Sequence, residues 1–151
     1  YAMSLHAIVD AHHQGYDENM YLDSATRTKV EETGGANFIF ITKDGKLVTP
    51  KSDTILPSIT RRSLMIVAKD YLGMEVEERE VYLEEVKDFA ECGLCGTAAV
   101  ISPIGELCYQ GKKYPITGGK IGEVTQMLYD TLTGIQWGKI EDTFGWIREV
   151  K

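Results

Sequence analysis

The chain has 151 residues, of which 43% are hydrophobic and 9% aromatic, and this suits a single domain with one sizeable core. A formal net charge of −7 argues against a nucleic-acid partner, because nucleic-acid modules usually carry a basic stripe and this sequence has none. No apolar run reaches the length of a membrane span, and the first residues lack the pattern of a signal peptide. We therefore expect no nucleic-acid and no membrane partner. The three cysteines favour a reducing, cytoplasmic location over a disulfide scaffold.

A short packed helix is predicted over residues 3 to 14. Its apolar positions recur at helical spacing and share one face, formed by Leu5, Ile8, Val9 and His12. Gly15 follows as the expected C-cap residue. Because the chain opens on Tyr1, close to this helix and without an initiator methionine, we expect it to be part of a longer protein.

Strands are predicted next. Residues 19 to 32 alternate like two strands, and "FIFIT" is expected to pair with "KLVTP" across the turn "KDG". A second helix is predicted over residues 60 to 72, with Thr60 placed to cap its first turn. Its apolar stripe is expected in the core and consists of Leu64, Met65, Ala68, Tyr71 and Leu72.

The rest of the chain interleaves strands and helices. Strands are predicted over residues 74 to 83, 94 to 105 and 106 to 116, with a helix over residues 83 to 91. A last helix over residues 121 to 132 should turn inward Ile121, Val124, Met127 and Leu128. The sequence therefore predicts an α/β fold with a mixed sheet and helices.

The start of the second helix is a candidate anion site. Backbone N–H groups at a helix start point outward unpaired and favour an anion such as phosphate, and Ile59 and Thr60 are placed to supply them. The alternative is that Thr60 only caps its own helix. A second stretch, at Gly96 and Thr97, could complete the same site or form a tight turn before a buried strand.

A carboxylate beside a glycine pair is the third candidate. Glu31 and Glu32 stand just before Gly34 and Gly35, where a carboxylate could bind a cationic ring nitrogen or be a solvated surface group.

Two metal-like patterns are weak. Cys92 and Cys95 have the spacing of half a zinc or redox site, but no second pair and no later histidine completes four ligands. His6, Asp10 and His13 share one helical face, for which a solvated surface is the simpler interpretation. We therefore expect no metal site.

Read together, these stretches resemble the large domain of the branched-chain amino-acid aminotransferases, which are class IV, or fold-type IV, pyridoxal-phosphate enzymes. The resemblance covers the chain from Tyr1 to the tail, in the family's order and spacing. It rests on the ordered motifs "GYDENMYLD", "EETGGANFIFI", "DGKLVTP", "ILPSITR", "GTAAVISPI" and "LTGIQWGKIEDTFGW". The last motif is similar to branched-chain enzymes more than to D-amino-acid aminotransferases or aminodeoxychorismate lyases.

The resemblance implies specific contacts with pyridoxal 5'-phosphate. Glu32 should face the pyridine nitrogen and keep it protonated, which makes the ring a better electron sink. Tyr1 should hydrogen-bond the phenolic oxygen of the ring, Leu56 should pack beside the ring, and Gly35 should give it room.

The resemblance also implies a phosphate and substrate site. The backbone N–H groups of Ile59 and Thr60, with the Thr60 hydroxyl, should bind the cofactor phosphate. Thr97 should add its hydroxyl, and the turn at Thr97 and Ala98 should bind the substrate carboxylate. Ser58 departs from the glycine usual in this motif, which raises the question of the loop's backbone conformation.

By this resemblance, residues 1–151 are the C-terminal cofactor-binding domain of a homodimeric transaminase of leucine, isoleucine or valine with 2-oxoglutarate. The family's Schiff-base lysine would lie just before Tyr1, and the N-terminal domain would also lie outside the chain. The chain alone is then expected to be inactive. The alternative is a non-catalytic anion-binding or dimerisation module with the same fold.

Overall fold

A computed structural model describes residues 4–150 of the chain. The main sheet has seven strands, which are β1 (Met20–Leu22), β2 (Val30–Thr33), β3 (Asn37–Ile41), β4 (Leu47–Pro50), β5 (Val76–Arg79), β6 (Glu91–Gly96) and β7 (Val100–Pro103). A separate hairpin consists of β8 (Glu106–Tyr109) and β9 (Lys112–Pro115). The helices are α1 (Ser4–His13), α2 (Ile59–Asp70) and α3 (Glu123–Gln136), with 3₁₀ turns η1 (Leu83–Asp88) and η2 (Thr117–Gly119). The predicted α/β class with a mixed sheet is confirmed.

Strand β3 is the centre of the sheet and pairs with three others. One edge of β3 pairs along its length with β6. The other edge is shared, because β2 pairs at its start (Glu32 with Asn37) and β4 at its end (Phe40 with Val48). Between them the Thr49 hydroxyl donates to the carbonyl oxygen of Phe38 at 2.8 Å. The sheet therefore forks along this edge, with β2 on one branch and β4 on the other.

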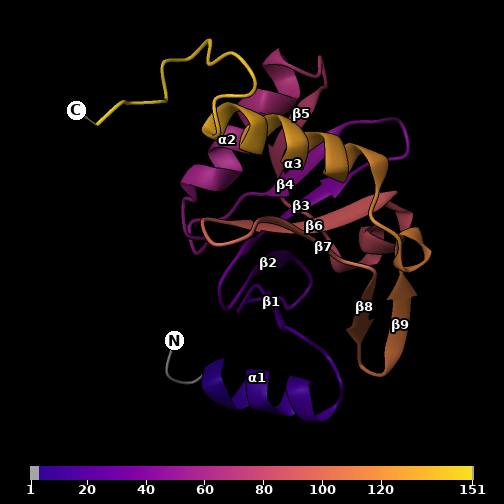
Figure 1. The fold of residues 1–151 in the computed structure, drawn as a ribbon. Coiled ribbons are helices and arrows are strands. Elements are labelled where there is room, and N and C mark those ends of the chain that lie inside the picture. The colour runs from indigo at the N-terminus through magenta and orange to yellow at the C-terminus, as the bar shows by residue number, and fades with distance from the viewer. Residues whose placement is uncertain (1–3, 151) are drawn as a thin grey trace.

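Both faces of β3 are covered, so all five of its residues are buried. Figure 1 shows α2 and α3 together on one face. The core on that face consists of Ile39, Ile41, Leu47, Leu64, Val67, Ala68, Cys95, Ile101, Leu128, Leu132 and Ile135. The core on the opposite face consists of Val30, Phe38, Phe40, Val48, Val81, Val86, Phe89, Cys92 and Ile116. One domain therefore has two apolar layers around a single sheet.

The strand order along β4 and β5 explains how α2 reaches the fork. β4 and β5 pair in parallel, which requires a crossover, and α2 is the helix of that crossover. Its predicted core stripe is confirmed, because Leu64 and Ala68 are fully buried and the other three side chains pack against them. This crossover places the start of α2 close to the end of β4.

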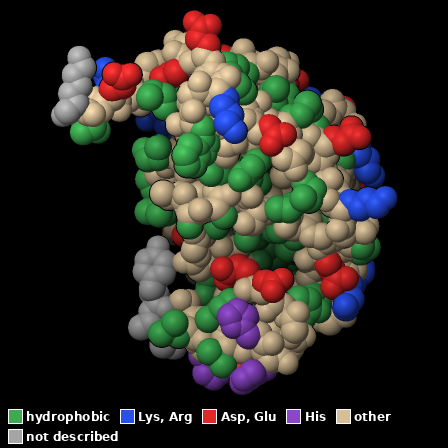
Figure 2. All heavy atoms as spheres, in the orientation of Figure 1, with side chains coloured by type: hydrophobic (Ala, Val, Ile, Leu, Met, Phe, Trp, Pro, Cys, Tyr) green, Lys and Arg blue, Asp and Glu red, His purple; other side chains and the backbone are tan. Residues whose placement is uncertain are grey.

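The first helix forms but does not pack as predicted. No residue of α1 is buried, and Leu5 and Val9 are 65% and 47% exposed. Gly15 ends the helix with φ +85°, as expected for a C-cap glycine. The apolar face meets no core within residues 4–150, and Figure 2 shows the histidines of this helix on the outer surface.

Several boundaries differ from the predictions. Residues 94 to 105 are not one strand but the end of β6 and all of β7, joined by a turn, and residues 106 to 116 form the β8–β9 hairpin. The predicted helix over residues 83 to 91 is a 3₁₀ turn followed by the start of β6. In α3, Leu128 is buried as expected, whereas Ile121 and Met127 are 57% and 48% exposed. The helix begins at Glu123, so Ile121 precedes it, and Met127 lies off the buried stripe that runs through Thr125, Leu128 and Leu132.

A buried carboxylate holds the start of α3. Glu91 is 8% exposed and accepts hydrogen bonds from the amide of Val124 at 3.0 Å and from the amide and hydroxyl of Thr125 at 2.7 Å each. The preceding Gly122 has no side chain to cap the helix, so a residue of β6 supplies the missing acceptor. Strand and helix are thereby fixed to each other.

Gly122→Ala should lower the free energy of unfolding by about 2 to 3 kcal/mol, because it would displace this carboxylate from its three donors. An alanine Cβ would lie 2.0 Å from the Glu91 carboxyl carbon. Urea unfolding measures the effect. Gly35→Ala is the control, since nothing lies within 4 Å of its Cβ. Equal stability of both variants would contradict this role of Glu91.

Candidate functional site

The predicted cofactor residues gather where the sheet forks. Glu32 ends up beside Leu56, because the amide of Leu56 donates to Glu32 Oε2 at 3.1 Å across 24 positions of sequence. A Cβ on Gly96 would lie 3.6 Å from the carbonyl oxygen of Gly35, so the glycine pair and the end of β6 are in close approach. Tyr1 lies outside the described residues.

The two neighbouring glutamates of β2 have different surroundings. Glu31 accepts hydrogen bonds from the hydroxyls of Ser52 and Thr54, which fasten the loop that leads to α2. Glu32 uses only Oε2, for Leu56 and for the side-chain amide of Asn37. Among residues 4–150 no hydrogen bond engages Glu32 Oε1. Glu32 therefore keeps one carboxylate oxygen available for a ligand.

The start of α2 offers unpaired donors. Ser58, not Thr60, is the N-cap, and its hydroxyl accepts from the amide of Arg61 at 3.2 Å, so the predicted cap at Thr60 is wrong. The amides of Ile59 and Thr60 precede the first intrahelical bond and have no helical partner. Ser58 has φ −73°, which any residue adopts, so the absence of glycine here costs the loop nothing.

The turn after β6 also presents its backbone. Thr97 and Ala98 are exposed in the three-residue turn between β6 and β7. The turn closes on Val100, whose φ of +61° lies in the left-handed region that β-branched residues avoid. Strained residues of this kind are concentrated at ligand sites. The β6–β7 ladder pairs Gly96 with Val100 and so joins the two ends of the turn.

Two polar residues of the site were missed by sequence reasoning. The Asn37 amide nitrogen donates both to Glu32 Oε2 at 3.1 Å and to the Leu56 carbonyl oxygen at 3.2 Å. Arg61 donates from Nη1 to the Pro50 carbonyl oxygen at 2.7 Å and pairs through Nη2 with Glu78 at 3.1 Å. A polar residue at the first position of a buried strand was the signal for Asn37.

These residues fit a flat ring that carries an anionic group. Glu32 supplies an acceptor for a ring N–H, Gly35 leaves open space beside it, and Leu56 is 61% exposed as an apolar surface. The free amides of Ile59 and Thr60 suit phosphate oxygens, at the positive end of a helix dipole. The donor set therefore matches pyridoxal phosphate in charge and in shape.

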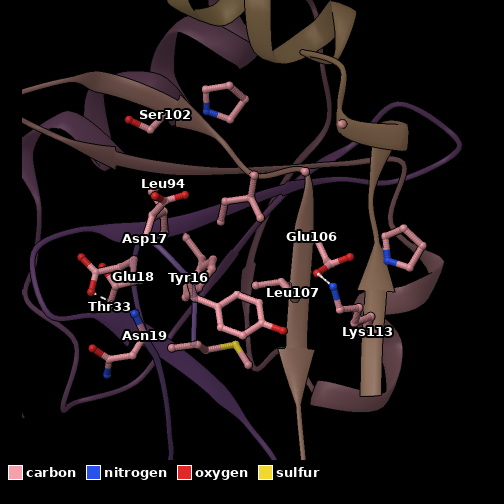
Figure 3. A pocket seen from close by; sticks show the side chains of 18 of the residues that line it. Tyr16, Asp17, Glu18, Asn19, Thr33, Leu94, Ser102, Glu106, Leu107 and Lys113 are labelled. Carbon is pink, nitrogen blue, oxygen red and sulfur yellow. Dashed lines mark hydrogen bonds and ion pairs between the residues drawn. The ribbon is translucent and has the colours of Figure 1, made fainter. Parts of the chain in front are cut away.

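A separate cavity of the described chain lies apart from these residues. It has a volume of about 700 Å³ and is lined from the α1–β1 connection, β6 and the β8–β9 hairpin, but by none of the predicted site residues. Figure 3 shows Glu18 and Asn19 on one wall and the ion pair of Glu106 with Lys113, 3.1 Å long, on the other. The cavity approaches the site at Thr33, Phe38 and Leu94.

Neither metal-like pattern forms a site. Cys92 and Cys95 belong to opposite core layers, so their thiols cannot converge on one ion. His6 and Asp10 form an exposed pair, 3.1 Å apart, and no group of three ligating side chains occurs in residues 4–150.

The helices within residues 4–150 are too short or too polar to cross a bilayer.

Only Cys108 should react with a thiol reagent in the native protein at pH 8. Burial raises the pKa of Cys95 to about 12 and that of Cys92 well above its usual range, so both remain protonated and non-nucleophilic. Cys108 is only half-buried. Labelling with a thiol reagent followed by peptide mapping should find Cys108 modified in the folded protein, and Cys92 and Cys95 modified as well only in denaturant. Rapid native reaction at Cys92 or Cys95 would contradict the layered core.

Comparison with known proteins bears on the family of the chain. The family model described as amino-transferase class IV matches residues 1–107. The chain is 49% identical over 150 residues to a branched-chain-amino-acid aminotransferase of Helicobacter pylori, and 51% identical over 137 residues to one of Haemophilus influenzae. These two matches cover 99% and 90% of this chain.

Solved structures match as well. The branched-chain amino acid aminotransferase of Escherichia coli aligns with a TM-score of 0.83 and 32% identity over 97% of this chain. That of Thermobaculum terrenum, in a PLP form, aligns with a TM-score of 0.78 and 35% identity over 88% of it. The alignments cover 47% and 41% of those chains, and 44% and 40% of the Helicobacter and Haemophilus proteins. The chain thus spans less than half the length of these relatives.

Proposed function

Because the chain belongs to the class IV aminotransferases, we propose that the full-length protein is a branched-chain amino-acid transaminase that binds pyridoxal 5'-phosphate at the forked edge of the sheet. The observation that carries this proposal is the arrangement of Glu32. Its Oε2 accepts hydrogen bonds from Leu56 and Asn37, while no hydrogen bond within residues 4–150 engages Oε1. A single free carboxylate oxygen beside an open apolar surface suits a protonated ring nitrogen.

Each residue of the site then has a role. Glu32 holds the proton on the ring nitrogen, and Leu56 packs on the ring. The amides of Ile59 and Thr60, with the hydroxyls of Thr60 and Thr97, bind the phosphate. When bound, pyridoxal phosphate supplies an electron-withdrawing ring that stabilises negative charge at the substrate's α-carbon.

The substrate is proposed from the turn and from the relatives. The exposed amides of Thr97 and Ala98 suit an α-carboxylate, which every amino acid and 2-oxo acid shares. The relatives named above are branched-chain enzymes, and a further branched-chain amino acid aminotransferase, 29% identical to this chain, has been crystallised with N-(5'-phosphopyridoxyl)-L-glutamate. This supports leucine, isoleucine or valine as amino donor and 2-oxoglutarate as acceptor.

The remaining machinery is proposed to lie in the rest of the protein. Residues 1–151 are the cofactor-binding domain, and Tyr1 contacts the phenolic oxygen of the ring. The cofactor-linking lysine and a second domain come from residues outside this chain, which is consistent with the greater length of the relatives. We place the enzyme in the cytoplasm as a homodimer.

The full-length protein should convert leucine and 2-oxoglutarate to glutamate, and Glu32→Gln should lower kcat about tenfold to hundredfold. An amide still reaches the ring nitrogen but cannot hold it protonated, and the loss of one charge-assisted hydrogen bond has this size. A coupled assay for glutamate measures it. Glu31→Gln is the matched control, because Glu31 bonds only Ser52 and Thr54.

The opposite result, with Glu31→Gln impaired and Glu32→Gln normal, would place the carboxylate one residue away. If the protein transfers no amino group from any branched-chain amino acid but still binds phosphate, the result would favour the non-catalytic anion-binding module.

Substitutions at Ser58 and Thr60 should separate capping from phosphate binding. Ser58→Ala should lower the free energy of unfolding by about 1 kcal/mol, because it removes the cap, with little effect on cofactor affinity. Thr60→Ala should leave apo stability unchanged and raise the cofactor's Kd about tenfold or more, since it removes one donor to a charged oxygen. Thr60→Ser keeps the hydroxyl and should behave like the parent.

Thermal melting of the apo protein and cofactor titration measure the two effects. An unchanged Kd in Thr60→Ala would remove Thr60 from the site.

A further inference from the structure

Asn37 occupies an unusual position for a polar side chain. It is 4% exposed and stands at the first position of the central strand, paired across to Glu32 on one side and to Cys95 on the other. Its four followers, residues 38–41, are all apolar and buried. A buried amide here must satisfy its donors, or the strand would lose stability.

The side-chain nitrogen of Asn37 is fully used. It donates to Glu32 Oε2 at 3.1 Å and to the carbonyl oxygen of Leu56 at 3.2 Å. Both partners are acceptors, so only the NH₂ end of the amide can face them. One side chain therefore holds a carboxylate of β2 and the backbone of the loop before α2 at the same time.

The three residues form a closed set of hydrogen bonds. The amide of Leu56 donates to the same Oε2 that Asn37 bonds, while Asn37 bonds the carbonyl of Leu56. Two donors on one oxygen restrict rotation of the Glu32 carboxylate, and no hydrogen bond within residues 4–150 engages Oε1. No other side chain among residues 4–150 hydrogen-bonds the Glu32 carboxylate.

We infer that Asn37 is a positioning residue, which orients Glu32 Oε1 toward the cofactor's ring nitrogen and locks Leu56 to the strand in the same geometry. The orientation of Glu32 toward the ring rests on the proposed function, whereas the hold of Asn37 on Glu32 and Leu56 concerns only this chain. Aspartate at this position would turn two acceptors toward a carboxylate, and serine would be too short to reach both partners.

The experiment compares Asn37→Ser with Thr49→Val in the full-length protein. Thr49 is equally buried in the same sheet and donates one hydrogen bond, to the Phe38 carbonyl, so its loss weakens the fold without touching Glu32. Two readouts are taken: amide hydrogen exchange at Leu56 in the apo protein, and kcat and KM with the cofactor bound. Melting temperatures check that both variants are folded.

In Asn37→Ser the Leu56 amide should exchange about tenfold faster, because the carboxylate that protects it is no longer held. With cofactor, kcat should fall about tenfold with KM little changed, and the cofactor's absorbance should change as it does in Glu32→Gln. Thr49→Val should show neither effect at comparable loss of stability. Asn37→Asp, which keeps the shape and reverses the hydrogen bonding, should be more impaired than Asn37→Ser.

Equal Leu56 exchange and equal kcat in Asn37→Ser and Thr49→Val would overturn the inference. If the parent protein transfers no amino group, the proposed function fails, and Leu56 exchange still decides whether Asn37 holds Glu32. Faster exchange with unchanged kcat would also overturn the inference, because Glu32 would then need no positioning.

Discussion

The structure depends on the sharing of one edge of β3 between two strands. A strand has only two edges, and β6 takes one of them completely, so β2 and β4 divide the other. Where β4 departs, the Thr49 hydroxyl satisfies a carbonyl that the ladder leaves unpaired. Where β2 takes over, Asn37 turns its side chain to the loop that follows β4. The branch point creates a place where a carboxylate and a loop can face the same opening.

The polar groups at the fork divide into those that hold and those that remain free. Glu31 hydrogen-bonds the loop before α2, and Ser58 caps the start of that helix. Arg61 hydrogen-bonds the end of β4. Within residues 4–150, Glu32 Oε1 and the first amides of α2 have no hydrogen-bond partner, which suits the proposed ligand. Because hydrogen-bonded neighbours fix these groups, the proposed site would need little rearrangement to bind a ring and a phosphate. The proposed function thus follows from how the unused donors and acceptors are arranged.

Local patterns in the sequence predicted most elements, and contacts between distant segments accounted for the rest. The Asp44-Gly45 hairpin and the stripe of α2 carry strong short-range signals and are confirmed. The prediction that α1 packs against the core was wrong, because an amphipathic sequence does not show whether another element lies near enough to cover its apolar face. The prediction that Thr60 caps α2 was wrong. Ser58 and Thr60 are equally plausible caps in the sequence, and only the backbone conformation at Ser58 decides between them. Asn37 was overlooked since its partners are 5 and 19 residues away along the chain.

The left-handed valine after the β6–β7 turn has an energetic consequence for any ligand of that turn. Holding a non-glycine residue at φ +61° costs about 1 to 2 kcal/mol, and the flanking ladder supplies that energy when the protein folds. A carboxylate that arrives later meets amides that are already aligned, so it need not order a loop as part of its own binding. Because glycine adopts a positive φ without strain, Val100→Gly would relieve this cost and allow the same turn conformation.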